Sequence, residues 1–433
     1  MKFKPHDLLR AGRSSIGRQA LAYMAFSAVT GVLTAATTAL LARELSTEGF
    51  GAFALSKSLL LLVASIFEFG IFFPAARLTA LSEGGLERRK WLGTILIAYV
   101  PLGLLYVATI SVLSLGVDSV FNVDAGHALL VTAPLGFAYP FTLVVVSISN
   151  GTGRAYLQPL MSAVAGAIVL AGIAALLVTT SEALSLTEVL ALRGAAFMVG
   201  GITIAVLIRP IFSGFRSRWL KIWTETRSWG MKAYAGRLVA IGTYNLDVLL
   251  VGALSDPAQL ASYGLALAGA SLIGLPAIAM ATALFPRMTR HGHLDHRPIV
   301  GLLVWGMLAT AVGSALAALI IPKYLNPELA DAAVLLIPLG LAATAGTVCT
   351  VLSTYLNARA AGKELRNTSV ILLASNLVLS VPLIALFDAM GAAVASFLSM
   401  LVTSVSYFYY VRRLGPPTSD LMQSGGGKGS ESS

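Results

Sequence analysis

Twelve long apolar runs occupy most of this sequence and limit the folds that are open to it. A helix that crosses a lipid bilayer needs about 20 mostly apolar residues, and each run reaches that length. The runs lack the two-residue alternation that is typical of membrane β-strands. We therefore expect an all-α polytopic membrane protein with about twelve transmembrane helices. The expected spans are residues 19–42, 51–73, 91–115, 127–149, 156–179, 187–208, 231–254, 261–285, 298–321, 331–356, 368–387 and 390–411.

Composition excludes the main alternatives to a membrane protein. Apolar residues make up 57% of the chain and charged residues 12%, whereas an ordinary soluble domain is about 25% charged. A soluble fold needs a largely polar surface, and a disordered chain needs low hydrophobicity, so both classes are excluded. Cys349 is the single cysteine, which leaves no intrachain disulfide and no thiolate metal cage.

The net charge of +10 reflects membrane orientation and does not indicate a nucleic-acid partner. If the N-terminus is cytoplasmic, the opposite loops hold only Arg43 and Lys323, and the spans hold Lys57, Arg193 and Arg237. All other lysines and arginines then lie in cytoplasmic segments or, for Lys232, at the cytoplasmic end of a span, where basic residues concentrate. We expect both termini to be cytoplasmic, with a secondary attraction of the basic loops to anionic membrane lipid.

The longest internal polar segment, residues 209–230, separates six spans from six more. Weak similarity between the second and eighth spans supports an internal repeat whose halves relate by an axis along the membrane normal. This arrangement predicts a six-helix lobe on either side of the segment. The expected parts are a cytoplasmic N-terminal segment (1–18), an N-lobe with spans one to six (19–208), a cytoplasmic linker (209–230), a C-lobe with spans seven to twelve (231–411) and a disordered cytoplasmic tail (412–433).

Four segments resemble a known family of transporters. Residues 40–55 read LLARELSTEGFGAFAL and are similar to the first outer turn of Wzx-type flippases of O-antigen and other polysaccharides. These form the polysaccharide biosynthesis branch of the multidrug/oligosaccharidyl-lipid/polysaccharide (MOP) exporter superfamily. The seventh helix of that branch resembles residues 244–252 (YNLDVLLVG). The end of its eighth helix resembles residues 281–287 (ATALFPR), and its last hairpin resembles residues 387–395 (FDAMGAAVA). The chain departs from the lipid-II flippases of the superfamily, which have two further helices.

This resemblance implies a transporter, not an enzyme, with two six-helix lobes around a central cavity. Such a protein would flip undecaprenyl-diphosphate-linked oligosaccharide from the inner to the outer leaflet of the bacterial cytoplasmic membrane, by alternating access. The product would serve biosynthesis of a lipopolysaccharide or exopolysaccharide. The implied partners are the lipid-linked oligosaccharide, membrane lipid, glycosyltransferases and a polysaccharide polymerase. No cofactor and no catalytic or metal site is expected.

The informative ionisable residues lie well inside the expected spans, away from their ends: Lys57, Glu68, Arg193, Arg237 and Asp247. A charge that faces lipid costs several kcal/mol, so each should face the protein interior or an aqueous cavity. Lys57 and Asp247 lie at matching depth near the outer surface, and Glu68 and Arg237 near the inner surface. One hypothesis is that these are two inter-lobe pairs that form alternately. The alternative is static pairing within a lobe, or extension of Lys57 to the outer interface.

The same residues are candidates for substrate binding and coupling. A dehydrated diphosphate needs charge-assisted donors, and the candidate donors are Arg237, Arg193 and Lys57. Tyr244 and Asn245 would bond to sugars, or else serve helix packing. Asp247 and Glu68 are the candidates for gating or ion coupling.

Two other functions stay open. A drug or cation antiporter of the same superfamily would favour acidic cavity residues, whereas the charges inside the spans are mostly basic. A membrane glycosyltransferase or polymerase acting on the same lipid carrier usually needs a large outer loop with paired carboxylates, and the longest outer loop, residues 116–126, is short. The histidines of residues 291–296 resemble a metal motif, but neighbouring arginines oppose a bound cation.

Overall fold

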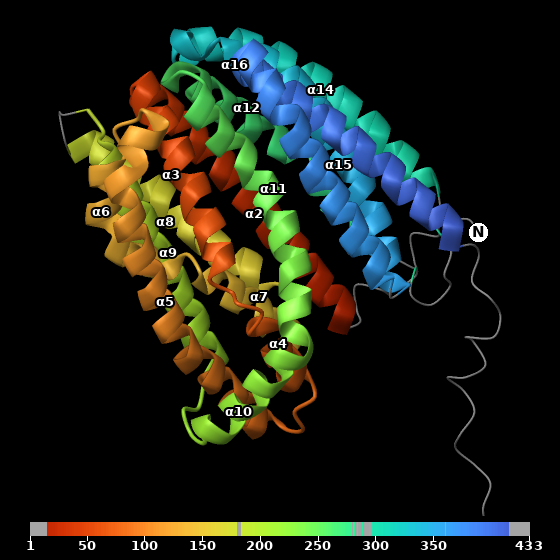
Figure 1. Ribbon diagram of the computed structural model, residues 1–433. Coiled ribbons are helices and arrows are strands. Elements are labelled where there is room, and N and C mark those ends of the chain that lie inside the picture. The colour runs from red at the N-terminus through yellow and green to blue at the C-terminus, as the bar shows by residue number, and fades with distance from the viewer. Residues whose placement is uncertain are drawn as a thin grey trace, which may run out of the picture.

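The computed structural model describes residues 15–179, 183–278, 296–359 and 361–414, together with 280–281, 284, 288 and 294. Within these helices, the described part excludes some side chains, namely those of residues 15–17, 20, 229, 232–233, 235–237 and 239–244. Every element in this part is a helix (Figure 1). In chain order they are α2 (Ser15–Glu44), α3 (Thr47–Ile66), α4 (Phe72–Ala80), α5 (Gly85–Phe121), α6 (Gly126–Thr132), η1 (Ala133–Ala138), α7 (Phe141–Thr152), α8 (Leu157–Thr179), α9 (Leu186–Ile208), α10 (Phe215–Glu225), η2 (Thr226–Gly230), α11 (Met231–Leu254), α12 (Pro257–Ile273), α14 (His296–Tyr324), η3 (Pro327–Leu329), α15 (Asp331–Ala358) and α16 (Gly362–Leu414).

The prediction of an all-helical polytopic membrane protein is confirmed. Within the described residues, 10 helical stretches are long and apolar enough to cross a membrane. The last one, α16, contains two expected spans that meet at a kink at Phe387 and Asp388. The expected seventh span lies on α11, on which Asn245–Leu254 is the apolar stretch within the described residues. The expected fourth span is divided into α6, η1 and α7 near Pro134 and Pro140, because proline cannot donate a helical hydrogen bond.

The expected second span is not one continuous helix, which corrects the sequence prediction. Between α3 and α4 the chain turns through Phe69 and Gly70, whose φ angles are 44° and 66°. A Cβ atom at Gly70 would lie 2.6 Å from the carbonyl oxygen of Gly230, so the close approach of the two backbones requires glycine here. Irregular backbone at membrane depth is tolerated where protein buries it. Glu68 therefore lies in a buried break between two helices.

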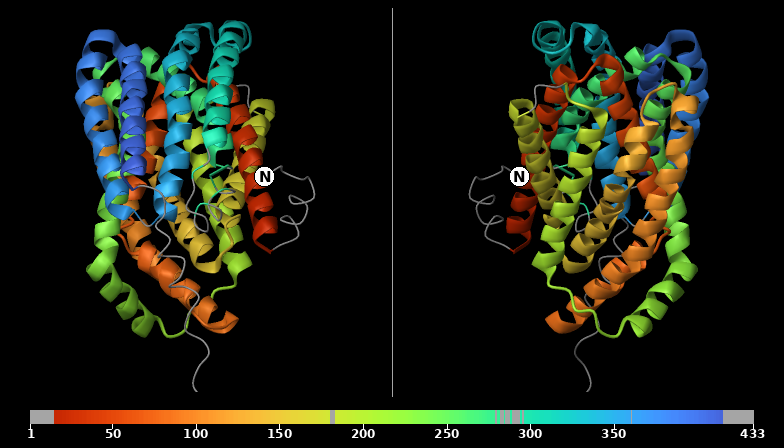
Figure 2. Two further views of the ribbon diagram at one scale, coloured as in Figure 1. Left: turned by 90° about the vertical axis from the view of Figure 1, so that its right-hand side faces the viewer. Right: turned by 90° about the vertical axis from the view of Figure 1, so that its left-hand side faces the viewer.

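The helices form two lobes, as Figures 1 and 2 show. In the N-lobe, α8 packs against α2 and α9, and α4 packs against α7. In the C-lobe, α15 packs against α12, α14 and α16, and α11 packs against α16. The main contacts between the lobes are those of α3 with α11 and α12. Following the predicted orientation, we call the end with the start of α3 the outer end and the end with α10 the inner end.

The apolar core of the protein differs between these two ends. Toward the outer end, a single cluster of buried side chains runs through both lobes and includes Phe50 of α3 and Leu260 of α12. Toward the inner end, the N-lobe has its own cluster around Trp91 and the C-lobe a separate one around Tyr355. Among the described residues, the buried cores of the two lobes are thus joined at the outer end and form separate clusters at the inner end.

Polar contacts also join the lobes at the outer end. Thr47, the first residue of α3, is buried and its hydroxyl donates to the carboxylate of Glu328 in η3. The side-chain amide of Asn326 donates to the Thr47 Oγ1 atom at 2.9 Å. We call Thr47, Asn326 and Glu328 the outer latch, because the contact links the N-lobe to the turn between α14 and α15.

The inter-lobe linker, residues 209–230, folds against the N-lobe, and its helix α10 lies at the inner end (Figure 1). Arg218 of α10 donates from its Nε atom to Glu87 at 3.0 Å, and this hydrogen bond holds the pKa of Glu87 below its usual value. The backbone N–H of Ile211 donates to the carbonyl of Arg89 at 2.9 Å. The linker is therefore attached to one lobe, and the chain enters the C-lobe only after η2.

Candidate substrate site

A cavity of about 290 Å³ lies between the two lobes, bounded by α2, α3, α11 and α12. Most of its wall is apolar or small, and its polar lining residues are Thr38, Lys57, Ser58, Asn245 and Ser271. Lys57 and Asn245, which come from different lobes, are two of the residues that the sequence predicted to bind substrate. The fold brings them to one inter-lobe cavity.

A second cation, Arg193 of α9, lies behind Lys57 in the N-lobe. Its charge is near enough to act on Lys57, and α9 contacts α3. The guanidinium carbon lies 5.2 Å from the ring centre of Phe197, and the Nε atom is buried without a hydrogen-bond partner in the described part of the chain. The N-lobe interior thus holds two like charges on the contacting helices α3 and α9.

Neither cation has an acidic partner within the described residues. All four salt bridges found there involve other side chains. They are Arg43–Glu44, Arg77–Glu225, Lys90–Glu87 and Arg218–Glu87. Two cations without an acidic partner in this part of the chain are costly in a membrane interior and favour a bound anion that offsets them.

Asp247 lies in a different place, inside the C-lobe. A cavity of about 270 Å³ is lined by Asp247 and by Asn376 and Ser396 of α16. The Ser396 hydroxyl donates to the Asp247 Oδ2 atom at 2.5 Å, and the Tyr263 hydroxyl donates to the same atom at 3.4 Å. The Oδ1 atom is buried and has no hydrogen-bond partner within the described residues.

The hypothesis of a Lys57–Asp247 pair does not describe this conformation, and helix geometry gives the reason. Residues two positions apart on a helix point about 200° apart. Asn245 faces the inter-lobe cavity, so Asp247 faces away from it and into the C-lobe. Leu267 and Ser271 of α12 line both cavities and form part of the wall between them.

The second hypothetical pair, Glu68–Arg237, stays a prediction. Arg237 lies on α11, but its side chain is outside the described part, as is that of Tyr244. Tyr234 of the same helix donates its hydroxyl to the carbonyl of Ile66 at 2.5 Å. Helix α11 therefore contacts the end of α3 two residues before Glu68.

Sequence reasoning missed the neutral partners of Asp247 and the outer latch. Asn376 is a polar residue inside an apolar span, and its presence there could have indicated a hydrogen-bonding neighbour of an intramembrane charge. The latch had no such signal, because Thr47 and Glu328 are ordinary residues of loop ends. The histidine motif at 291–296 lies mostly outside the described residues, and no metal-binding group of His, Cys, Asp and Glu occurs within them.

The two helical lobes, joined at one end with a cavity between them, form a fold that solved structures of membrane transporters share. The chain belongs to the polysaccharide biosynthesis protein family, whose model matches residues 16–291. No curated protein matches the chain.

Solved structures of the MOP superfamily share the fold. The lipid II flippase MurJ in its inward closed conformation is 15% identical, with a TM-score of 0.71, over 89% of this chain and 87% of that one. An inward-facing multidrug resistance MATE transporter of the superfamily is 14% identical, with a TM-score of 0.65, over 91% of this chain and 98% of that one. The Vibrio cholerae MATE transporter VcmN in its bent form is 14% identical, with a TM-score of 0.54, over 94% and 98%.

Proposed function

We propose that this protein flips an oligosaccharide linked to undecaprenyl diphosphate from the inner to the outer leaflet of the bacterial cytoplasmic membrane, for biosynthesis of a surface polysaccharide. The observation that carries the proposal is the pair of cations Lys57 and Arg193, which have no acidic partner in the described part of the chain. The membership in the polysaccharide biosynthesis family and the fold shared with a lipid II flippase support it.

The cation pair suits a diphosphate better than a cationic drug. Hydrogen bonds to charged groups contribute about 1.5–3 kcal/mol each, and a diphosphate offers several acceptor oxygens to Lys57 and Arg193 together. A cationic drug would instead be repelled by both side chains. Outward movement of the anion is also favoured by a membrane potential that is negative inside, by about 2.3 kcal/mol per charge and 100 mV.

The arrangement of the lobes supports entry of the substrate from the inner side. The outer latch and the shared core close the outer end, whereas the cores of the lobes are separate at the inner end. Release to the outer leaflet then requires that Thr47 separates from Asn326 and Glu328. The same step would open the inter-lobe cavity, and Lys57 with it, to the outer side.

Asp247 has a separate role in this proposal. Its C-lobe cavity, its neutral hydrogen-bond donors and its unpartnered Oδ1 atom suit uptake of a proton or a small cation. Because Asp247 does not face the substrate cavity, we propose that it biases the movement of the lobes without touching the diphosphate.

Transport by the purified protein in proteoliposomes tests the function. The substrate is a fluorescent oligosaccharide on undecaprenyl diphosphate, and the variant Lys57→Met is compared with Lys323→Met, which alters an exposed lysine at the outer end. We expect the wild type and the control to flip the substrate. The flipping rate of Lys57→Met should fall about 10-fold to 100-fold, because one or two hydrogen bonds to a charged group are lost. Transport of an organic cation, without flipping of the diphosphate lipid, would overturn the proposal in favour of an antiporter.

A further inference from the structure

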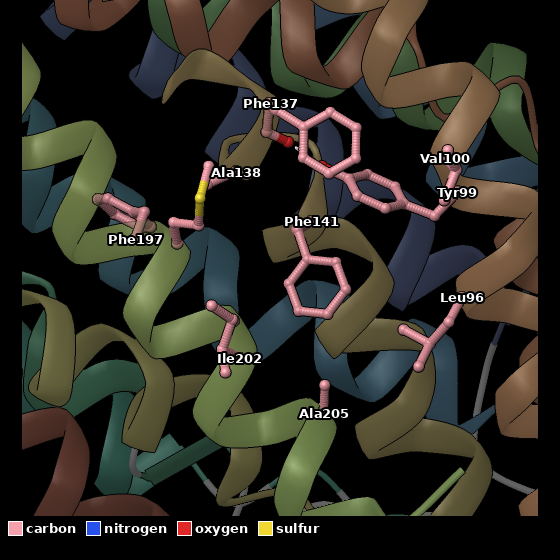
Figure 3. Close-up of a pocket in the computed structure, with 11 residues that line it drawn as sticks. Leu96, Tyr99, Val100, Phe137, Ala138, Phe141, Phe197, Ile202 and Ala205 are labelled. Atoms are coloured by element: carbon pink, nitrogen blue, oxygen red, sulfur yellow. Dashed lines mark hydrogen bonds between the residues drawn. The ribbon is translucent and has the colours of Figure 1, made fainter. Parts of the chain in front are cut away.

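An apolar pocket lies in the N-lobe, away from the inter-lobe cavity (Figure 3). Helices α5, α7 and α9 and the turn η1 enclose a volume of about 160 Å³. In Figure 3 the ring of Phe141 lies between the side chains of Ile202 and Leu96, with the ring of Phe137 above it. Ile202 is 57% exposed, so the pocket opens at the outside of the helix bundle, where lipid chains lie.

The walls of this pocket suit a hydrocarbon chain and no polar group. All lining residues are apolar apart from Tyr99, and the Tyr99 hydroxyl donates to the carbonyl of Phe137. An apolar cavity of about 150 Å³ stays dry and holds one benzene molecule. The pocket therefore accommodates a short segment of hydrocarbon, about six carbon atoms long, and not a lipid headgroup.

Phe197 connects this pocket to Arg193, the cation that lies behind Lys57. Its ring is part of the pocket wall, and the Arg193 guanidinium lies 5.2 Å from the centre of the same ring. Tyr139 stacks on Phe197 at 5.3 Å, which fixes the ring between the two sites. From Arg193 to Ala205, at the far end of the pocket, α9 rises about 18 Å toward the inner side.

This juxtaposition favours one class of lipid. The cations select a headgroup with several negative charges, and the pocket selects an apolar chain within reach of that headgroup. A polyprenyl diphosphate has both features, whereas a zwitterionic phospholipid lacks the multiply charged headgroup.

We propose that the N-lobe pocket binds a segment of the polyprenyl chain of the lipid-linked substrate while the diphosphate lies at Lys57 and Arg193. This inference rests on the proposed function and adds a binding site for the lipid tail. The tail would remain on the lipid-exposed side of α5 and α9 while the headgroup enters the space between the lobes.

Chain-length dependence tests the tail site. Ala205→Phe fills the pocket, and Leu104→Phe adds the same ring at a site on α5 that is 60% exposed and not part of the pocket. Flipping is measured with one oligosaccharide diphosphate on an undecaprenyl chain or on a ten-carbon geranyl chain. We expect Ala205→Phe to slow flipping of the undecaprenyl substrate about tenfold, from the lost burial of a few carbons, and to leave the geranyl substrate unchanged. Equal effects on both substrates, or none, would overturn the site.

A second measurement does not depend on transport. A photoactivatable undecaprenyl diphosphate is expected to label the peptide with Phe137 and Phe141 in the wild type and in Leu104→Phe, and not in Ala205→Phe. Labelling without flipping would overturn the proposed function and keep the tail site. Flipping without labelling of this peptide would overturn the tail site alone, as would equal labelling by a photoactivatable phosphatidylcholine.

Discussion

Around the inter-lobe cavity and the C-lobe cavity, the two lobes carry opposite charges. In the N-lobe, Lys57 and Arg193 lie near one another without an acidic partner in the described residues. In the C-lobe, Asp247 is surrounded by the neutral donors Ser396 and Tyr263. Asp247 and these cations would form an ion pair if they were adjacent, but α12 lies between them. We infer from this contrast that the cations are held available for an anionic substrate and the acid for a coupled ion.

The largest effect is expected from Lys57→Glu. A carboxylate at this position would pair with Arg193 and remove both cations from the substrate site, so flipping should fall at least about 100-fold, as for two or more charged hydrogen bonds. The flux of a fluorescent undecaprenyl-diphosphate oligosaccharide in proteoliposomes measures this.

Thermal unfolding of the same variant separates a loss of binding charge from a loss of folding. The new carboxylate beside Arg193 should leave the melting temperature unchanged or raise it, because the substitution relieves repulsion between like charges. Lys323→Glu, at the exposed outer end, is the matched charge reversal and should retain transport. Full flipping by Lys57→Glu would show that the N-lobe cations do not bind the substrate.

Asp247→Asn should have an intermediate effect that depends on the ion gradient. The amide keeps the size of the side chain but cannot take up a proton or balance a cation, so gradient-driven flipping should fall about tenfold, within the range usual for coupled sites. Flipping without a gradient should be unchanged. Asp256→Asn, which alters an exposed aspartate before α12, is the control. An equal loss with and without a gradient would contradict the separation of roles.

The spans could be predicted from the sequence, whereas the facing of individual residues could not. Long apolar runs are sufficient to identify membrane helices, because lipid requires every backbone group to bond within its own segment. Matching depth suggested that Lys57 meets Asp247, but depth says nothing about rotation around a helix. Asn245 and Asp247 lie two positions apart and face different cavities.

The break that contains Glu68 shows a second limit of the sequence. The apolar run continues through residues 51–73, and composition alone gives no reason to end a helix at Ile66. The turn depends on the contact of Gly70 with Gly230, which lies in the linker far along the chain. Such a tertiary contact overrides local helix propensity.

The outer latch is expected to have a smaller effect, on the balance between conformations. Thr47→Val keeps the shape of the side chain but removes the hydrogen bonds to Asn326 and Glu328, which together contribute about 1 kcal/mol at the lower end of the usual range. The outward-open population should rise about fivefold, which corresponds to about 1 kcal/mol, measured by distances between spin labels at the outer ends of the two lobes. Ser46→Ala is the control, since it removes the cap of α3 without touching the latch. An unchanged population would mean that the latch does not hold the lobes together.

The smallest effect is expected at the inner end, where Glu87→Gln weakens the attachment of the linker. Arg218 holds the Glu87 pKa below its usual value, so this contact stabilises the folded linker at neutral pH and is lost as the pH falls through the lowered pKa. Hydrogen exchange of the Ile211 amide should be slightly faster in the variant at neutral pH. The difference should vanish once the pH lies below the range in which Glu87 ionises. Glu83→Gln, at an exposed site, should match the wild type at both pH values.

Binding of undecaprenyl diphosphate to the purified protein decides whether the N-lobe cations form the substrate site. Dissociation constants are compared for the wild type, Lys57→Met, Arg193→Met and Asp247→Asn by native mass spectrometry. If the N-lobe cations hold the diphosphate, the first two variants lose about tenfold or more in affinity, and Asp247→Asn binds as the wild type does. Retained affinity in Lys57→Met and Arg193→Met, together with a loss in Asp247→Asn, would contradict this assignment.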